Sequence, residues 1–226
     1  DIPADVILDH NYGAEIIWHD QHPSGAMMLI GPQFALIDPS FRVARANAHC
    51  LRIDPSDKFR IVVSLGASDP ANLTKTVVAT LTNHFESLRW LDIVVGRSNP
   101  HISELSMETE KLANAKLHVQ TSEMATLLAG ADIAIGAGGV STLERACIGV
   151  PTIGVAIADN QLGALRAMDA DGLHIFVENS ANFHSVLVET LENLLVDTQR
   201  RAAMTKNSRE AVDGRGSERV VSKLLN

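Results

Sequence analysis

Short apolar runs alternate with amphipathic segments along most of the chain. From Phe59 onward the apolar runs have the length and β-branched content of buried strands: FRIVVSLG (59–66), WLDIVVG (90–96), KLHVQ (116–120), DIAIG (132–136), PTIGVAI (151–157) and LHIFV (173–177). The segments between them have helical spacing of apolar residues, at 71–83, 101–114, 124–131, 141–149 and 160–170. After 177 the pattern is helical to the end, and its last amphipathic piece spans 216–225.

This alternation predicts an α/β fold, a Rossmann-like parallel sheet with helices on both faces. Continuous apolar strands support it, because a parallel sheet is covered on both sides. Ligands of such sheets bind outside the carboxyl ends of the strands. We therefore expect any site to lie along that edge, where three runs end in glycine and small polar residues: SLGASD (64–69), VVGRSN (94–99) and IGAGGVST (135–142).

The first part of the chain has a less regular pattern. VILDH (6–10) reads as the end of a buried strand, and MMLIG (27–31) as a second short strand before the turn at Gly31-Pro32. The stretch 54–57, Asp-Pro-Ser-Asp, is the best candidate for a linker.

Composition narrows the function classes. The 226 residues are 46% hydrophobic and 20% charged, enough for a buried core, and the net charge of -8 argues against a nucleic-acid surface. No apolar run reaches membrane-spanning length, no signal peptide opens the chain, and the isolated Cys50 and Cys147 make a reducing cytoplasm the default. The nine histidines form no common metal-binding pattern, so we expect no metal site.

The glycine cluster after the fourth apolar run carries the clearest chemistry. Gly136, Gly138 and Gly139 let the backbone approach a ligand, and the helix that follows offers free amides and a positive dipole end. With the hydroxyls of Ser141 and Thr142 they make a candidate phosphate cradle. The pattern is neither a P-loop, since Gly-Lys-Ser/Thr is absent, nor the dinucleotide fingerprint in its usual place.

Glu144 has two interpretations. Ser141 and Glu144 have the spacing of a capping box, in which Ser141 is the N-cap and Glu144 reaches back to its amide. Alternatively, the carboxylate accepts hydrogen bonds from a ribose diol, as acidic residues do in nucleotide sites. The two roles compete for the same oxygens, and both stay open.

Two further turns repeat this logic. In SLGASDPANLT (64–74), Gly66 closes the strand and Ser68 precedes Asp69, which could be the N-cap of a helix starting at Pro70. In the third turn, the amides of Asn160 and Gln161 could bind sugar hydroxyls, or Asp159 could simply be an N-cap.

Taken in order, these motifs resemble one family. DHNYGAE (9–15), LIGPQFALI (29–37), SLGASDPANLT (64–74), VVGRSNPH (94–101), MATLLAGADIAIGAGGVSTLERACIGVP (124–151) and ADNQ (158–161) are similar to the UDP-2,4-diacetamido-2,4,6-trideoxy-β-L-altropyranose hydrolases of pseudaminic acid biosynthesis. A more distant likeness is to MurG-type glycosyltransferases, which share the GT-B fold of two Rossmann-like domains. The resemblance implies that residues 1–54 are the end of an amino-terminal domain with its linker, and that 55–226 form a nucleotide-binding carboxyl-terminal domain.

The resemblance also implies roles for individual residues. Gly138, Gly139, Ser141 and Thr142 would sit at the UDP pyrophosphate, and Glu144 would hold the ribose. The stretch from Gln120 to Met124 would frame the uracil. Further roles would fall to Asn160 and Gln161 at the sugar, to Gly66 and Ser68 across the cleft, and to Tyr12 and Glu15 at the end of the amino-terminal domain.

The implied reaction releases UDP by adding water at the sugar's anomeric carbon, without a cofactor. The family's catalytic histidine lies in a Gly-x-Gly-His segment that this sequence does not contain, so the catalytic base is unknown and we expect this chain to bind UDP without turnover. The alternatives are a GT-B glycosyltransferase and a non-catalytic UDP-binding module. The expected partner is UDP or a UDP-sugar, with neither nucleic acid nor membrane, and self-association is possible.

Overall fold

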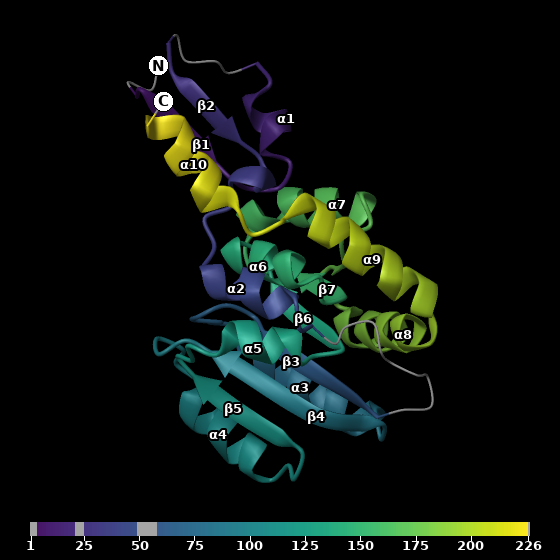
Figure 1. Ribbon diagram of the computed structural model, residues 1–226. Coiled ribbons are helices and arrows are strands. Elements are labelled where there is room, and N and C mark those ends of the chain that lie inside the picture. The colour runs from purple at the N-terminus through teal and green to yellow at the C-terminus, as the bar shows by residue number, and fades with distance from the viewer. Residues whose placement is uncertain (1–3, 21–24, 49–57, 226) are drawn as a thin grey trace.

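The computed structural model describes residues 4–20, 25–48 and 58–225 (Figure 1). Its strands are β1 (Val6–Asp9), β2 (Met27–Ile30), β3 (Phe59–Ser64), β4 (Leu88–Val95), β5 (Ala115–Val119), β6 (Ile133–Ala137), β7 (Thr152–Val155) and β8 (Ile175–Val177). Its α-helices are α1 (Ala14–Trp18), α2 (Pro39–Arg45), α3 (Leu73–His84), α4 (Ile102–Glu110), α5 (Met124–Ala129), α6 (Val140–Ile148), α7 (Leu162–Ala170), α8 (Phe183–Val196), α9 (Thr198–Ala211) and α10 (Gly216–Leu225). Two short 3-10 helices are η1 (Pro32–Phe34) and η2 (Asp159–Gln161).

Six strands form one parallel sheet in the order β5-β4-β3-β6-β7-β8, which confirms the six predicted strands and the fold class. The order runs outward in both directions from the neighbouring strands β3 and β6. The crevice at this topological switch point is where open α/β sheets bind ligands. Both strands lead directly into predicted site loops.

Helices cover both faces of this sheet. On one face, α3 and α8 pack apolar side chains on residues such as Ile61, Ile93 and Ile135. On the other face, α2, α5 and α6 pack on the strand residues whose side chains point that way, such as Val62 and Val94. Burial on both sides is the reason that the strands are continuously apolar.

A second, small sheet pairs β1 and β2 in parallel, with Val6 opposite Met27. Each sheet packs against a helix that is next to the other sheet in sequence. Helix α2 follows the small sheet in sequence, but its Phe41 lies in the core with α5 and α6. The last helix, α10, runs back along the small sheet, and its Gly216 lies against the backbone of Ala35 (Figure 1). The predicted linker at 54–57 lies outside the described residues, and the division at residue 54 stays a prediction.

The start of α3 differs from its prediction. The helix begins at Leu73 with Asn72 as N-cap, instead of at Pro70 with Asp69 as N-cap. Asp69 and Asn72 both have positive φ, so the chain makes an extra turn before the helix. The Asp69 carboxylate still satisfies the first-turn amides, at 2.9 Å from the nitrogen of Leu73 and 2.8 Å from that of Thr74.

The two other predicted caps are also wrong. Helix α6 has Gly139 as its N-cap, which places Ser141 inside the first turn, so no capping box forms. The positive φ of 93° at Gly139 lets the chain enter the helix two residues before Ser141, the predicted N-cap. Asp159 is the first residue of η2, and its side chain caps neither that turn nor α7.

Two findings bear on the expected environment. Within the described part of the chain, no helix is both long and apolar enough to cross a membrane. Cys147 is buried and has a free thiol, while Cys50 lies outside the described residues.

Candidate functional site

The carboxyl ends of β3 and β6 lie side by side, with Ser64 in register with Gly136. The loops that leave them converge on the segment after β7. A Cβ atom on Gly66 would come within 2.9 Å of the Ile157 side chain, and one on Gly138 would lie 2.7 Å from Cβ of Gln161. Three predicted site loops are therefore in contact at the switch point.

The first turn of α6 faces open space. A Cβ on Gly139 would meet no atom within 4 Å, so the backbone here is bare on the side away from the sheet. The amides of Val140 and Ser141 are the first two of the helix and have no intrahelical acceptor. Bare backbone and free amides at a positive helix end are the elements of an anion site.

The two hydroxyls of the turn differ in their geometry. Thr142 is buried, and its hydroxyl donates inward to the carbonyl of Ala137 at 3.1 Å. Ser141 is half-buried, and its oxygen accepts from Arg145 at 3.4 Å, which leaves its own proton for another acceptor. In this geometry Thr142 shapes the turn, and Ser141 is the hydroxyl able to donate to a ligand.

Arg145 lies directly beneath the turn and is 3% exposed. Its Nη2 donates to the carbonyl of Ala137 at 2.5 Å and to the hydroxyl of Thr142 at 3.1 Å, while its buried Nε has no acceptor. A methyl group on Gly136 would overlap the guanidinium, so this glycine makes the room for it. Burial lowers the pKa of Arg145 to about 10, which leaves it charged at neutral pH.

No carboxylate forms an ion pair with Arg145 among the described residues. Buried charges are normally paired, because burial removes their hydration. The guanidinium therefore adds positive charge beneath the helix end, offset only by the electrostatic attraction of the neighbouring Glu144. This charge favours an anion at the glycine turn.

Glu144 precedes Arg145 in α6 and is half-buried. No hydrogen bond or ion pair to its carboxylate is found among the described residues, although the nearby Arg145 interacts with it electrostatically. Burial raises the pKa of the Glu144 carboxyl above its ordinary value, more than Arg145 lowers it. A half-buried carboxylate without a hydrogen-bond donor among the described residues is able to accept from a ligand.

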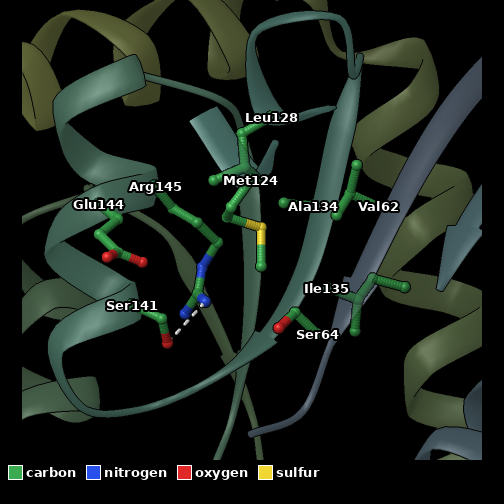
Figure 2. A pocket seen from close by; sticks show the side chains of 9 residues that line it. All are labelled: Val62, Ser64, Met124, Leu128, Ala134, Ile135, Ser141, Glu144 and Arg145. Carbon is green, nitrogen blue, oxygen red and sulfur yellow. Dashed lines mark hydrogen bonds between the residues drawn. The ribbon is translucent and has the colours of Figure 1, made fainter. Parts of the chain in front are cut away.

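Two hollows flank the first turn of α6. The α5–α6 hollow, as we name it, lies between α5, α6 and the strands β3 and β6 (Figure 2), and is lined by Val62, Ser64, Met124, Leu128, Ala134, Ile135, Ser141, Glu144 and Arg145. The glycine-turn hollow lies on the other side, and is lined by Asn11, Tyr12, Gly138, Gly139, Thr142, Leu143, Ala164, Leu165 and Met168. Figure 2 shows the side chains of Glu144 and Arg145 leaving α6 near Ser141, with Met124 beside them.

Most predicted site residues thus lie around one helix turn. Met124, Ser141 and Glu144 share the α5–α6 hollow, and Tyr12 lines the glycine-turn hollow. The Tyr12 hydroxyl donates to Asp171 at 2.7 Å. Gln161 covers Gly138 and accepts from the amide of Ile157 at 3.1 Å.

The remaining predicted site residues lie farther from the first turn of α6. Ser68 and Asn160 are exposed and line neither hollow, and Glu15 lies over Gly31 instead. Gln120 has a positive φ and accepts from the amide of Arg97 at 3.3 Å. Sequence reasoning missed the inward role of Arg145 and the lining residue Ser64. The signal available for Arg145 was that this charged residue directly precedes the small and apolar positions 146–150.

Comparison with known proteins gives one clear sequence relative. No family model matches the chain. It is 29% identical over 197 residues to the spore coat polysaccharide biosynthesis protein SpsG of Bacillus subtilis strain 168, an alignment that covers 86% of this chain and 57% of SpsG.

Solved structures share the fold. MurG of Acinetobacter baumannii matches with a TM-score of 0.64 at 18% identity, over 98% of this chain and 60% of MurG. The spinosyn rhamnosyltransferase SpnG complexed with thymidine diphosphate matches with a TM-score of 0.58 at 19% identity, over 79% of this chain and 49% of SpnG. The arrangement of sheet and helices is that of GT-B glycosyltransferases, and the chain spans about half to three fifths of these proteins.

The raised pKa of Glu144 makes a prediction about stability. Its ionised carboxylate destabilises the folded state, and this cost is absent below the ordinary pKa of 4.5 and grows as pH rises through the raised value. We expect Glu144→Gln to be more stable than the wild type at pH 7–8, and the difference to disappear near pH 4. Urea unfolding across this range measures it.

The exposed Glu192 of α8 offers a matched control, because Glu192→Gln deletes a carboxylate that is exposed to solvent. Its stability difference from the wild type should not follow the same pH profile. A Glu144→Gln variant that is less stable than the wild type at pH 7.5 would contradict the account of an unpartnered carboxylate.

Proposed function

We propose that this chain is the nucleotide-sugar-binding part of an enzyme of glycan biosynthesis, and that its site at the switch point binds the UDP moiety of a UDP-sugar. The observation that carries the proposal is the open backbone at Gly139, backed by the buried charge of Arg145, which forms no ion pair among the described residues. The relative in polysaccharide biosynthesis and the fold shared with SpnG support the same class of substrate.

The diphosphate would lie at the first turn of α6. The amides of Val140 and Ser141 and the Ser141 hydroxyl would donate to its oxygens. The helix dipole and Arg145 would stabilise its negative charge, in a chain whose net charge is otherwise -8. Thr142 would contribute by holding the turn closed against Ala137.

The nucleoside would lie against the α5–α6 hollow. Glu144 would accept hydrogen bonds from the ribose hydroxyls, which would give this buried carboxylate the donors that it lacks. Met124 and the preceding residues from Gln120 would frame the uracil. The half-buried thioether of Met124 offers an apolar, polarisable surface for a planar base.

The sugar would extend from the diphosphate toward η2, past the contact between Gln161 and Gly138. Gln161 and Asn160 would hydrogen-bond its hydroxyl or amide groups through their side-chain amides. Gly66 and the exposed Ser68 would border the same opening from the β3 side. Tyr12 would approach the diphosphate from the glycine-turn hollow.

Two reactions are consistent with such a site. The fold of MurG and SpnG and the role of SpsG favour glycosyl transfer from the UDP-sugar to an acceptor. The motif set from DHNYGAE (9–15) to ADNQ (158–161) favours the second candidate, hydrolysis with release of UDP and a free sugar. None of the residues above is assigned as the catalytic base.

UDP binding tests the site directly. We expect the 226-residue chain to bind UDP in calorimetry, and Glu144→Ala and Glu144→Gln to bind it about tenfold or more weakly, because each loses a charged hydrogen-bond acceptor. Circular dichroism checks that the variants fold. Absence of binding by the folded wild type would refute the site, and undiminished binding by both variants would refute the ribose role.

The charge beneath the turn gives a second test. Arg145→Gln removes the charge but retains a side chain that can donate to the Ala137 carbonyl, so we expect a loss of about tenfold in affinity for UDP and little change for uridine. Arg201→Gln is the matched control, since it removes another buried guanidinium, one that donates to the carbonyls of Leu194 and Leu195. Equal losses for UDP and uridine in Arg145→Gln would show a purely structural role.

The two reactions are separated by their need for an acceptor. For the protein as its gene encodes it, glycosyl transfer predicts that UDP release from a UDP-sugar rises strongly when a sugar or lipid-linked acceptor is added. Hydrolysis predicts release at the same rate without one. A coupled assay for UDP, run with and without acceptor, measures the difference.

A further inference from the structure

Two histidines meet on the surface, apart from the residues that line the nucleotide site. His84 is the last residue of α3, and His184 is the second residue of α8. Their Nε2 atoms lie 3.0 Å apart, and both side chains are exposed. Helices α3 and α8 lie next to each other on the face of the sheet opposite α6, so the pair joins segments 100 residues apart.

A hydroxyl sets the orientation of one ring. Thr80 donates its proton to the carbonyl of Thr76 at 2.8 Å, and its oxygen lies 2.9 Å from Nδ1 of His184. With the Thr80 proton on that carbonyl, Nδ1 of His184 is the donor to Thr80. The lone pair of neutral His184 is then on Nε2, and it faces His84.

This arrangement is typical of metal-binding histidines. A ligating imidazole usually donates its second N–H to a neighbouring acceptor, which fixes the tautomer and the ring orientation. Thr80 is 1% exposed and anchored to its own helix, so it supplies such an acceptor in a fixed place.

The spacing also suits a metal ion. Two imidazole nitrogens that bind one ion at about 2.0–2.1 Å lie about 2.8–3.4 Å apart, for angles between octahedral and tetrahedral. The ring centroids are 4.8 Å apart and the ring planes are inclined by 66°, so the rings do not meet end to end. The two lone pairs can therefore converge on a point beside the Nε2–Nε2 line.

We propose that His84 and His184 form a two-histidine site for a divalent transition-metal ion of the Zn²⁺, Ni²⁺ and Cu²⁺ class, which clasps α3 to α8. Imidazole nitrogen suits these ions. Neutral His84 becomes a ligand when its proton moves from Nε2 to Nδ1 through solvent, so no net proton leaves the ring. Water would complete the coordination, because no group of three or more His, Cys, Asp or Glu side chains able to hold a metal occurs in the described ranges. The net charge of -8 favours cation binding.

Calorimetry with Ni²⁺ on the tag-free chain tests this proposal. We expect one binding site that is lost in His84→Ala and equally in His184→Ala. The control His101→Ala should retain it, since His101 lies elsewhere, with Nε2 3.2 Å from the carbonyl of Pro70. Ni²⁺ should also raise the thermal midpoint of the wild type and of the control, because a ligand that binds only the folded state stabilises it.

Thr80→Val separates a built site from two histidines that happen to be close. It keeps both imidazoles and the size of the side chain but removes the acceptor for Nδ1 of His184, so we expect Ni²⁺ affinity to fall by tenfold or more. No Ni²⁺ binding by the wild type, or binding that survives the loss of either His84 or His184, overturns the proposal. UDP binding should be unchanged in all of these variants, so the outcome is independent of the proposed nucleotide site.

Discussion

The contact between the Arg145 guanidinium and the carbonyl of Ala137 fixes the end of β6 against the first turn of α6, and the candidate site is built on it. The hydrogen bonds to Ala137, Thr142 and Ser141 partly replace the hydrogen bonds to water that the buried guanidinium has lost. The orphaned Nε and the missing ion pair leave the compensation incomplete in the free protein. An anion at the helix end would complete it, and this is the physical basis of the proposed anion site.

The sheet explains why the polar groups gather there. A parallel sheet covered by helices on both faces has no exposed face at which a ligand could bind. Ligands therefore bind at the ends of its strands. The reversal of strand order between β3 and β6 separates the loops that follow them and opens a crevice. Gly66, Gly138 and Gln161 come from three different loops, yet they border that same crevice.

Hydrophobic periodicity was sufficient to predict the six strands, because burial on both faces leaves continuous apolar runs that are easily recognised. Helix starts were harder to predict. The starts of α3 and α6 depend on positive φ at Asn72 and Gly139, and capping patterns do not reveal where the chain adopts that conformation. The glycine turn and Glu144 could be proposed as site residues from the sequence because their spacing is local.

Arg145 was missed for a different reason. A charged residue in a helix is ordinarily solvent-exposed, and its burial here depends on the absence of a side chain at Gly136, nine positions earlier on a strand. Tyr12 illustrates the same limit, because its place beside the glycine turn depends on how the small sheet docks on α7. Contacts of this kind depend on the assembled fold and have no local signature.

The exchange of helices between the two sheets has a mechanical consequence. The chain passes between them at two places, at 35–38 before α2 and at 212–215 before α10, and Gly216 holds the second passage against Ala35 of the first. The two passages therefore lie side by side, and any movement of the small sheet relative to the large one would have to bend both of them together. Such a movement would also have to break or preserve the hydrogen bond from Tyr12 to Asp171, beside the glycine-turn hollow.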